Sequence, residues 1–511
     1  GAGITTGVRN VLIGGNTGDA LTEGNYNTAV GYQALSDDDE GEYNTAIGYF
    51  ALENYNDGDG NGHNTAVGAQ SQRNASTGEF NTSFGSLSMG VGVTTGDNNV
   101  AVGYRAGEDI TSGAANTLIG REAGDALTSG SNNVAIGYAA LTQEDAHGLN
   151  VAVGVTALMT LNAGADGLNV GIGYAAGAAM TTGTNSVVIG ALAGDALTTG
   201  EGNVAVGKAA LSTETTGGKN TAIGARSQED VNNSGNGNNV SVGFESMLNA
   251  TTAVANTAIG SSAIGDGILT GDFNTVVGYL SGMDLTSGYD NVLVGAEAGT
   301  NLTTGFGNIA VGKEALETSP DGIHNTAIGY QTLQDYNDGS TNGHNTAVGS
   351  RSQLQATTGE FNTSLGSLSM GSGVTTGDNN VAVGYSAGLA LTSGTENTLV
   401  GANAGDALTT GTHNTAVGKN ALTTETNRGK NTAIGASALQ ILNSGAQGYN
   451  TAVGSEAGVA MTTGVQNTIV GANAGDKLTT GTRNVAIGYL ALNAEDTGNR
   501  NVAIGCDALL V

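Results

Sequence analysis

The stretch NTLVGANAGDALTTGTH, residues 397–413, is one unit of a repeat that fills the chain of 511 residues. Its first five residues follow the pattern Asn-[Thr/Val]-x-[Val/Ile]-Gly, which occurs 29 times. The Gly is present in every copy, and Ser186 replaces the Asn once. The fourth residue is Val or Ile except at Phe84 and Leu365. A fixed period of this kind is the signature of a repeat architecture, so it governs every later inference about the fold.

Most intervals between successive copies equal the one from Asn397 to Asn414, and slightly longer intervals, such as Asn44 to Asn64, are inserted in a fixed order. The order starts again at Asn325, so that the segment 44–230 repeats as 325–511. No linker divides the array, and we expect a single continuous domain over residues 1–511. Both ends fall inside a repeat, whereas natural solenoids usually carry distinct caps. We therefore expect the chain to be a piece of a longer polypeptide.

The composition argues against several classes of protein. Gly contributes 87 residues without falling at every third position, and there is one Pro, so the chain is not collagen. A formal net charge of −30 argues against nucleic acid and anionic membrane surfaces as partners. No apolar run approaches the roughly 18 residues of a membrane span, so we expect no membrane insertion. The only Cys, Cys506, cannot form a disulfide within the chain.

The unit itself predicts an all-β fold. Its first five residues alternate with the period of two that is typical of a strand, and the Leu-Thr-Thr-Gly at 408–411 predicts a second short strand. A coil of this length is too short for a βαβ unit, which needs about 30 residues. We therefore predict a parallel β-solenoid (β-roll) of about 29 coils, with a 17- to 20-residue period and two short strands per coil.

Alternation also predicts which side chains face inward. The second and fourth residues point to one face, where they form a thin apolar stripe, and the third and fifth point to the other. The third is mostly Ala and the fifth is always Gly, so we expect this second face to lie against another backbone. Stacked Asn side chains are expected to hydrogen-bond along the axis, with a weaker bond at Ser186. Because one coil offers few large aliphatic residues, we predict a homotrimer packed on the Gly and Ala face.

Two strings carry a resemblance to known proteins: NTAVGYQAL at 27–35 and LTTGTHNTAVG at 408–418. They resemble the repeats of bacteriophage tail fibres that end in a self-cleaving intramolecular chaperone domain. They are also similar to the coils in the heads of trimeric autotransporter adhesins. The resemblance covers essentially the whole chain and implies a left-handed, trimeric β-roll.

One metal site is a candidate. Asp57, Asp59 and Asn61 stand at alternate positions, as in the first half of a calcium loop, where carboxylates converge on a hard cation. The place of the bidentate Glu is taken by Gly68, and the copy at 338–343 has one carboxylate fewer. A solvated turn is the favoured interpretation, and the sequence suggests no cofactor other than calcium.

Other polar and aromatic groups have a structural and a functional interpretation. The acidic run at 37–40 is interpreted as a solvated surface rather than an acid/base pair. Thr-Thr-Gly segments could form an ice-binding lattice, but they are replaced in many coils, and local bonding of the hydroxyls explains them. The histidines all lie in turns without the spacing of a metal pair: His63, His147, His324, His344 and His413.

Nine tyrosines follow the motif Gly and could form a glycan-stacking stripe. We favour a role in shielding strand edges and the interface between coils. These residues are Tyr32, Tyr49, Tyr104, Tyr138, Tyr174, Tyr279, Tyr330, Tyr385 and Tyr489.

Together these observations favour a non-enzymatic structural fibre with no catalytic residues. The leading hypothesis is a rigid spacer in a phage tail fibre, part of the virion, that takes part in host attachment. The alternative is a bacterial surface adhesin or a secreted extracellular filament, and a host cell-surface glycan or protein would be the receptor. A polysaccharide-binding or depolymerising tail spike is disfavoured because the chain has no Trp and no insertion longer than three residues. The high charge of a trimer predicts a saline medium outside the cell.

Overall fold

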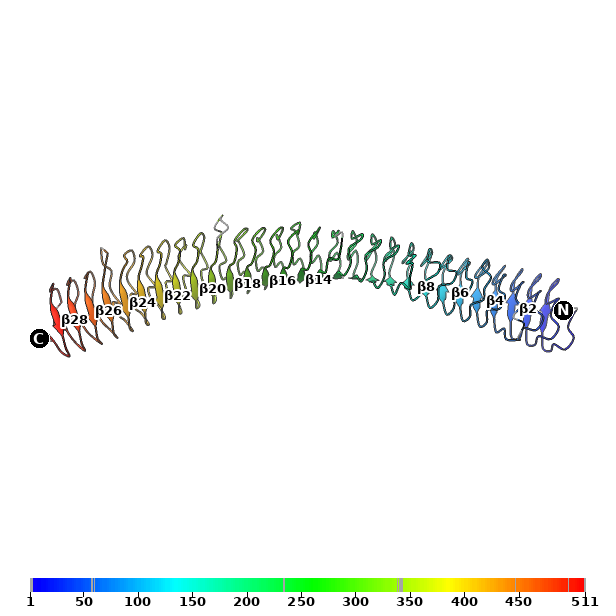
Figure 1. Cartoon of the computed structure of the whole chain (residues 1–511), viewed down its shortest axis with the longest axis horizontal. Coiled ribbons are helices and arrows are strands. Elements are labelled where there is room, and N and C mark those ends of the chain that lie inside the picture. Colours follow the sequence, from blue (N-terminus) through cyan, green and yellow to red (C-terminus); the bar gives the residue numbers. More distant parts are fainter. Residues whose placement is uncertain are drawn as a thin grey trace. The chain divides into compact units, whose positions relative to one another are not determined.

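The computed structural model describes residues 3–56, 58, 60–232, 235–337, 339, 343–445, 447–494 and 496–509. The chain divides into two compact units, Gly1–Ala255 and Asn256–Val511. Within each unit, successive coils stack side by side and contribute neighbouring parallel strands (Figure 1). The predicted parallel β-solenoid is confirmed, because each motif supplies one strand to the sheet. The described part of the chain has no helix with the length and apolar character of a membrane span.

Each strand consists of the second, third and fourth residues of one motif. The strands of the first unit are β1 (Val11–Ile13), β2 (Thr28–Val30), β3 (Thr45–Ile47), β4 (Thr65–Val67), β5 (Thr82–Phe84), β6 (Val100–Val102), β7 (Thr117–Ile119), β8 (Val134–Ile136), β9 (Val151–Val153), β10 (Val170–Ile172), β11 (Val187–Ile189), β12 (Val204–Val206), β13 (Thr221–Ile223) and β14 (Val240–Val242). The strands of the second unit are β15 (Thr257–Ile259), β16 (Thr275–Val277), β17 (Val292–Val294), β18 (Ile309–Val311), β19 (Thr326–Ile328), β20 (Thr346–Val348), β21 (Thr363–Leu365), β22 (Val381–Val383), β23 (Thr398–Val400), β24 (Thr415–Val417), β25 (Thr432–Ile434), β26 (Thr451–Val453), β27 (Thr468–Val470), β28 (Val485–Ile487) and β29 (Val502–Ile504).

The register between neighbouring strands is the same whether the interval is short or long. Across a 17-residue interval, Thr398 of β23 pairs with Thr415 of β24. Across a 20-residue interval, Thr326 of β19 pairs with Thr346 of β20 in the same way. The extra residues of enlarged coils therefore lie outside the sheet.

The predicted second strand is absent from the described coils. In the segment that begins at Leu408, the amides of Thr409 and Thr410 both donate to one carbonyl, that of Thr426 in the next coil. Two successive amides that share an acceptor do not alternate as in a β ladder. Each described coil consequently has one strand of three residues, and the rest is turns, bends and irregular backbone, with an isolated parallel bridge between Gly218 and Asn236.

The structure also corrects the assignment of faces. The third motif residue is buried inside the coil, as at Leu399 and Ala416, where it packs in one cluster with Ala404 and Leu408 of the same chain. The second and fourth residues are half-buried or exposed and lie outside. Packing of two further copies on the Gly and Ala face is therefore wrong, because the chain itself covers that face. The homotrimer stays a prediction.

The invariant Gly is explained by a close approach between coils. Gly401 has φ of +137°, and a Cβ placed on it would lie 2.5 Å from the carbonyl oxygen of Gly418 in the next coil. A side chain is excluded both by the backbone conformation and by the lack of space. The expected contact with another backbone is thus confirmed, but the backbone is that of the next coil.

In the coils of β23 and β24, the sizes of the third and ninth residues, which fill the core, compensate each other. In the coil of β23 the third residue is Leu399 and the ninth is Gly405, where a Cβ would lie 2.9 Å from the Leu399 side chain. In the coil of β24 the third residue is Ala416, and the ninth is Leu422, which is fully buried. Either position can carry the large side chain, because a close-packed interior requires a constant total volume.

The Asn side chains form the expected ladder. The Asn414 amide donates to Oδ1 of Asn397 at 3.0 Å, and Nδ2 of Asn414 donates to the carbonyl of Arg428 at 3.0 Å. Where Ser186 replaces Asn, its Oγ still accepts from the amide of Asn203, at 3.2 Å. Each buried Asn therefore ties its own coil to a neighbouring one and fixes the entry of the strand.

Candidate functional site

Among the described residues, buried carboxylates replace the core leucine in four coils. Leu408 is the twelfth residue of its coil and is fully buried, and the same position holds the fully buried Asp38, Glu144, Glu214 and Glu425. Each of these coils directly precedes an enlarged coil, whose motif Asn stands 19 or 20 positions before the next one. Buried acids thus mark places where the size of the coil changes.

The reason for these acids lies in the backbone hydrogen bonds. In a regular coil the fifteenth amide donates to the thirteenth carbonyl of the next coil, as from Gly394 to Thr409 at 3.1 Å. In each coil that precedes one of these enlarged coils, the buried acid accepts the hydrogen bond of the fifteenth amide instead. The Gly41 amide donates to Oδ1 of Asp38 at 2.8 Å, and the Gly217 amide donates to Oε1 of Glu214 at 2.7 Å. A buried amide without an acceptor would be costly, so the carboxylate replaces the neighbouring carbonyl.

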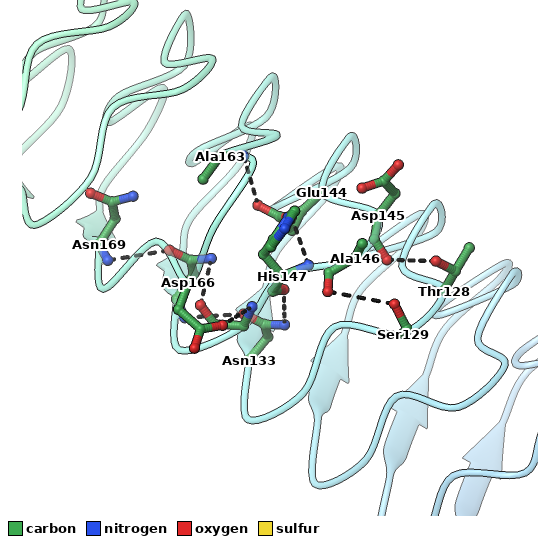
Figure 2. A network of polar contacts seen from close by, with 12 residues as sticks. Thr128, Ser129, Asn133, Glu144, Asp145, Ala146, His147, Ala163, Asp166 and Asn169 are labelled. Carbon is green, nitrogen blue, oxygen red and sulfur yellow. Dashed lines mark hydrogen bonds and ion pairs between the residues drawn. The ribbon is translucent and has the colours of Figure 1, made fainter.

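One of these turns also gathers a histidine. Glu144 Oε1 accepts from the His147 amide at 3.1 Å, and Oε2 accepts from the Ala163 amide of the enlarged coil at 3.4 Å. The ring nitrogen Nδ1 of His147 lies 3.5 Å from Oε1 of Glu144. Figure 2 shows the Glu144 carboxylate beside the His147 ring, with Ala163 reaching it from the adjacent coil. Ligand atoms of Glu144, Asp145 and His147 all lie within 4.8 Å of one another.

Burial alters the acidity of these groups. It raises the pKa of Glu144 and of Glu425, because both charges are removed from water, and hydrogen bonds from the backbone partly oppose the shift. Burial also raises the pKa of Asp125 to about 6 and raises that of Asp406, its counterpart in the copy at 325–511. Proton uptake is therefore favoured in the folded state at several equivalent turns.

The calcium candidate falls mostly outside the described residues. Asp57 and Asp59 lie there, and so do Asp338 and Asn342 of the copy. Of Asn61 the structure shows that its carbonyl accepts a hydrogen bond from the Tyr55 hydroxyl at 3.1 Å. The calcium site stays a prediction.

We predicted that the acidic run at 37–40 is solvated, and the structure shows that this is not true of all its residues. Asp38 is fully buried and, besides the Gly41 amide, accepts from Nδ2 of Asn44 at 3.3 Å. The reason is its place at the twelfth position, which points into the core regardless of its neighbours. The run of acids alone does not indicate this burial, and the signal in the sequence is that Asp38 stands at the place in the coil that Leu408 occupies in its own.

The other histidines take structural positions. His63 is stacked between Tyr43 and Phe80, with ring centroids 4.7 and 5.0 Å away. His324 and His344 lie in a second series of ring contacts, 4.9 Å apart. His413 pairs with Glu396 through Nε2 and Oε2 at 2.7 Å. Structural placement is therefore observed for these four, whereas His147 faces a buried carboxylate.

The nine tyrosines after the motif Gly are all exposed. Tyr32 and Tyr49 stack at 5.8 Å, and the Arg121 guanidinium lies over the rings of both Tyr104 and Tyr138. In such stacks, side chains of neighbouring coils cover the faces of each other's rings. Both the shielding role and the glycan stripe stay predictions.

The repeated threonines bond between coils. Thr198 Oγ1 donates to the carbonyl of Thr215 at 2.8 Å, and Thr409 Oγ1 donates to that of Thr426 at 3.0 Å. The hydroxyl therefore does bond to backbone, but in the next coil rather than in its own turn.

No protein-family model matches the chain, and a search among curated proteins gives no match either.

Proposed function

We propose that this chain is a non-enzymatic structural fibre, the rigid shaft of a bacteriophage tail fibre that holds a receptor-binding tip away from the particle. The observation that carries the proposal is the uninterrupted bonding from coil to coil within each unit. At each step the backbone contributes bonds on both sides of the strand. The Thr398 amide donates to the Asn414 carbonyl at 2.8 Å, and the Gly401 amide donates to the Val383 carbonyl at 2.7 Å.

Side chains add further bonds at the corners of the same coils. The Asn ladder lies at the start of each strand, and the Thr hydroxyls bond across the opposite turn, as from Thr409 to Thr426. Elements that contact only their neighbours gain length without changing the local structure. This construction suits a spacer, whose purpose is extent and stiffness.

Assembly into a trimer belongs to this proposal, with the interface on the strand face. The fourth motif residues form a row of apolar side chains along the outside, and Ile47, Ile119 and Ile172 are examples that are more than a third exposed. The second motif residues beside them are Thr or an aliphatic residue. In-register rows of such side chains on parallel strands are able to bury apolar area against a second copy. The Gly and Ala face is not available for this purpose because it is filled from within.

The proposal is tested by mass and length together. Sedimentation should give three times the mass of one chain, and electron microscopy should show rods of roughly 135 Å, which is about 4.8 Å for each of 28 intervals. Val417→Asp on the strand face should reduce the mass to that of the monomer while the β-sheet circular dichroism persists. A folded wild-type monomer would contradict the trimer. If an antibody raised against this chain did not label the fibres of virions, the phage assignment would be contradicted.

A surface adhesin is the second candidate, favoured by one open depression in the second unit. It is lined by the rings of Phe273 and Tyr289 together with Asp272, Ser287 and Asp290. Aromatic faces beside carboxylates and hydroxyls are typical of sugar contacts. Binding on a glycan array that is lost in Phe273→Ala but retained in Phe361→Ala would favour this candidate.

A further inference from the structure

The turn 144–147 presents two ligand atoms that face each other without a hydrogen bond between them. Nδ1 of His147 is buried and neither accepts nor donates a hydrogen bond. It lies 3.5 Å from Oε1 of Glu144. This separation is too long for a good N–H···O bond. It is close to the roughly 3.4 Å that separates two ligands each about 2.1 Å from one tetrahedral ion.

The backbone holds both groups in place. The His147 amide donates to Glu144, and the His147 carbonyl accepts from Nδ2 of Asn133 at 3.1 Å. Glu144 is fully buried at the position of a core leucine and is further fixed by the Ala163 amide. The Glu144 carboxylate and the backbone of His147 are therefore fixed by the fold.

Asp145 supplies a third ligand from the solvent side. Its carbonyl accepts from the Thr128 amide at 2.6 Å and from the Thr128 hydroxyl at 2.8 Å, which fixes its backbone. Its side chain is exposed and projects from the same turn (Figure 2), and its carboxylate is among the ligand atoms within 4.8 Å. The two carboxylates repel each other, because like charges are held close together in one turn. A cation between them would remove that repulsion.

The copy of this turn at 425–428 provides an internal contrast. Glu425 is fully buried and accepts from the Arg428 amide at 3.2 Å, as Glu144 does from His147. There Thr426 replaces Asp145 and Arg428 replaces His147, so the ligand set is absent although the backbone bond is kept. The acid alone is therefore structural, and the other two side chains are what distinguish the first turn.

We propose that Glu144, Asp145 and His147 bind a divalent transition-metal ion of the Zn²⁺ type. Two carboxylate oxygens and one imidazole nitrogen suit Zn²⁺ better than Ca²⁺, which prefers oxygen ligands only. Three protein ligands leave at least one position for water. Bound metal links the turn to the enlarged coil through Glu144 and Ala163, so it stabilises the junction between the coils of β8 and β9.

The test uses the full chain after removal of metal by a chelator, titrated with Zn²⁺ in the presence of excess Mg²⁺ to suppress binding to surface carboxylates. We expect one Zn²⁺ per chain by calorimetry, and a Co²⁺-substituted sample with the visible spectrum of mixed nitrogen and oxygen ligands. The double variant Asp145→Thr/His147→Arg carries the residues of the copy, which folds with them. It should lose at least about tenfold in affinity.

The reciprocal variant keeps the proposal falsifiable if the first one misfolds. Thr426→Asp/Arg428→His should raise the stoichiometry from one to two ions per chain. His413→Gln, outside the turn, should leave binding unchanged. Absence of Zn²⁺ binding by the wild-type chain, or undiminished binding by Asp145→Thr/His147→Arg with unchanged circular dichroism, would overturn the proposal.

Discussion

The coil at 133–149 and its copy at 414–430 have the same architecture and different chemistry. Both bury an acid at the twelfth position, and in both the acid accepts the amide three residues later, from His147 at 3.1 Å and from Arg428 at 3.2 Å. Only the first has a carboxylate and an imidazole beside it. The difference teaches that the acid belongs to the change in coil size, whereas a binding site requires further side chains in the same turn.

The largest effect should come from placing an acid where no change in coil size requires it. Leu408→Glu puts a carboxylate into a regular coil that is followed by another 17-residue interval. The charge would be buried without the amides that Glu425 receives, so we expect a loss of about 3–5 kcal/mol in local stability. Hydrogen exchange of peptides from the neighbouring coils measures it. Leu408→Met, which conserves volume, should cost less than about 1.5 kcal/mol, and equal protection of both variants would contradict our account.

Loss of an Asn from either coil should have the next largest effect. Asn133 and Asn414 each donate from Nδ2 to a carbonyl of their own turn and accept through Oδ1 from the next Asn amide. Asn→Ala leaves these buried groups unpaired, and we expect a cost of about 2–3 kcal/mol at either site. The control is Asn→Ser, which occurs naturally at 186 and retains an acceptor. Chemical denaturation followed by circular dichroism would refute the ladder's role if Ala and Ser variants were equally stable.

A smaller effect should separate the two acids themselves. Glu425 Oε2 accepts from both the amide and the hydroxyl of Ser444, at 3.2 and 3.1 Å, whereas Glu144 Oε2 accepts one longer bond from Ala163. Glu→Gln replaces one acceptor by a donor, so Glu425→Gln should lose about 1–2 kcal/mol and Glu144→Gln less. Exchange rates of the Ser444 and Ala163 amides report the two sites separately. The reverse order would show that the enlarged coils are held by other contacts.

The smallest effect is a dependence of stability on pH. Burial raises the pKa of Asp125 to about 6, and it raises the pKa values of Asp406, Glu144 and Glu425. A raised carboxyl pKa means that the folded state binds the proton more tightly, so stability is greatest at low pH and falls as pH rises toward the folded-state pKa. We expect the melting temperature to be higher at about pH 5 than at about pH 7.5.

High salt distinguishes this cause from general repulsion within a chain of net charge −30. Salt screens repulsion between exposed charges but affects buried groups much less. The pH dependence should therefore persist at high ionic strength and should diminish in Asp125→Asn. A dependence that disappears in salt would assign it to surface charge.

Much of the fold could be predicted because the motif repeats. The period gave the solenoid, the invariant Gly indicated close backbone contact, and the Asn indicated a ladder. The second strand was wrong because a Leu-Thr pattern does not reveal that the amides of Thr409 and Thr410 share one acceptor. The cluster of Glu144 and His147 was missed although the sequence held a signal. Glu144 stands at the position that Leu408 occupies in the coil 397–413.

By itself, the sequence determined the number of coils and the places where coils enlarge, because these depend only on spacing along the chain. The tertiary structure decided which face is inside. Alternation divides a strand into two faces but does not say which one the returning chain will cover. That depended on Leu408 and its equivalents folding back over the third motif residue, and on buried carboxylates supplying acceptors where one coil no longer matches the next.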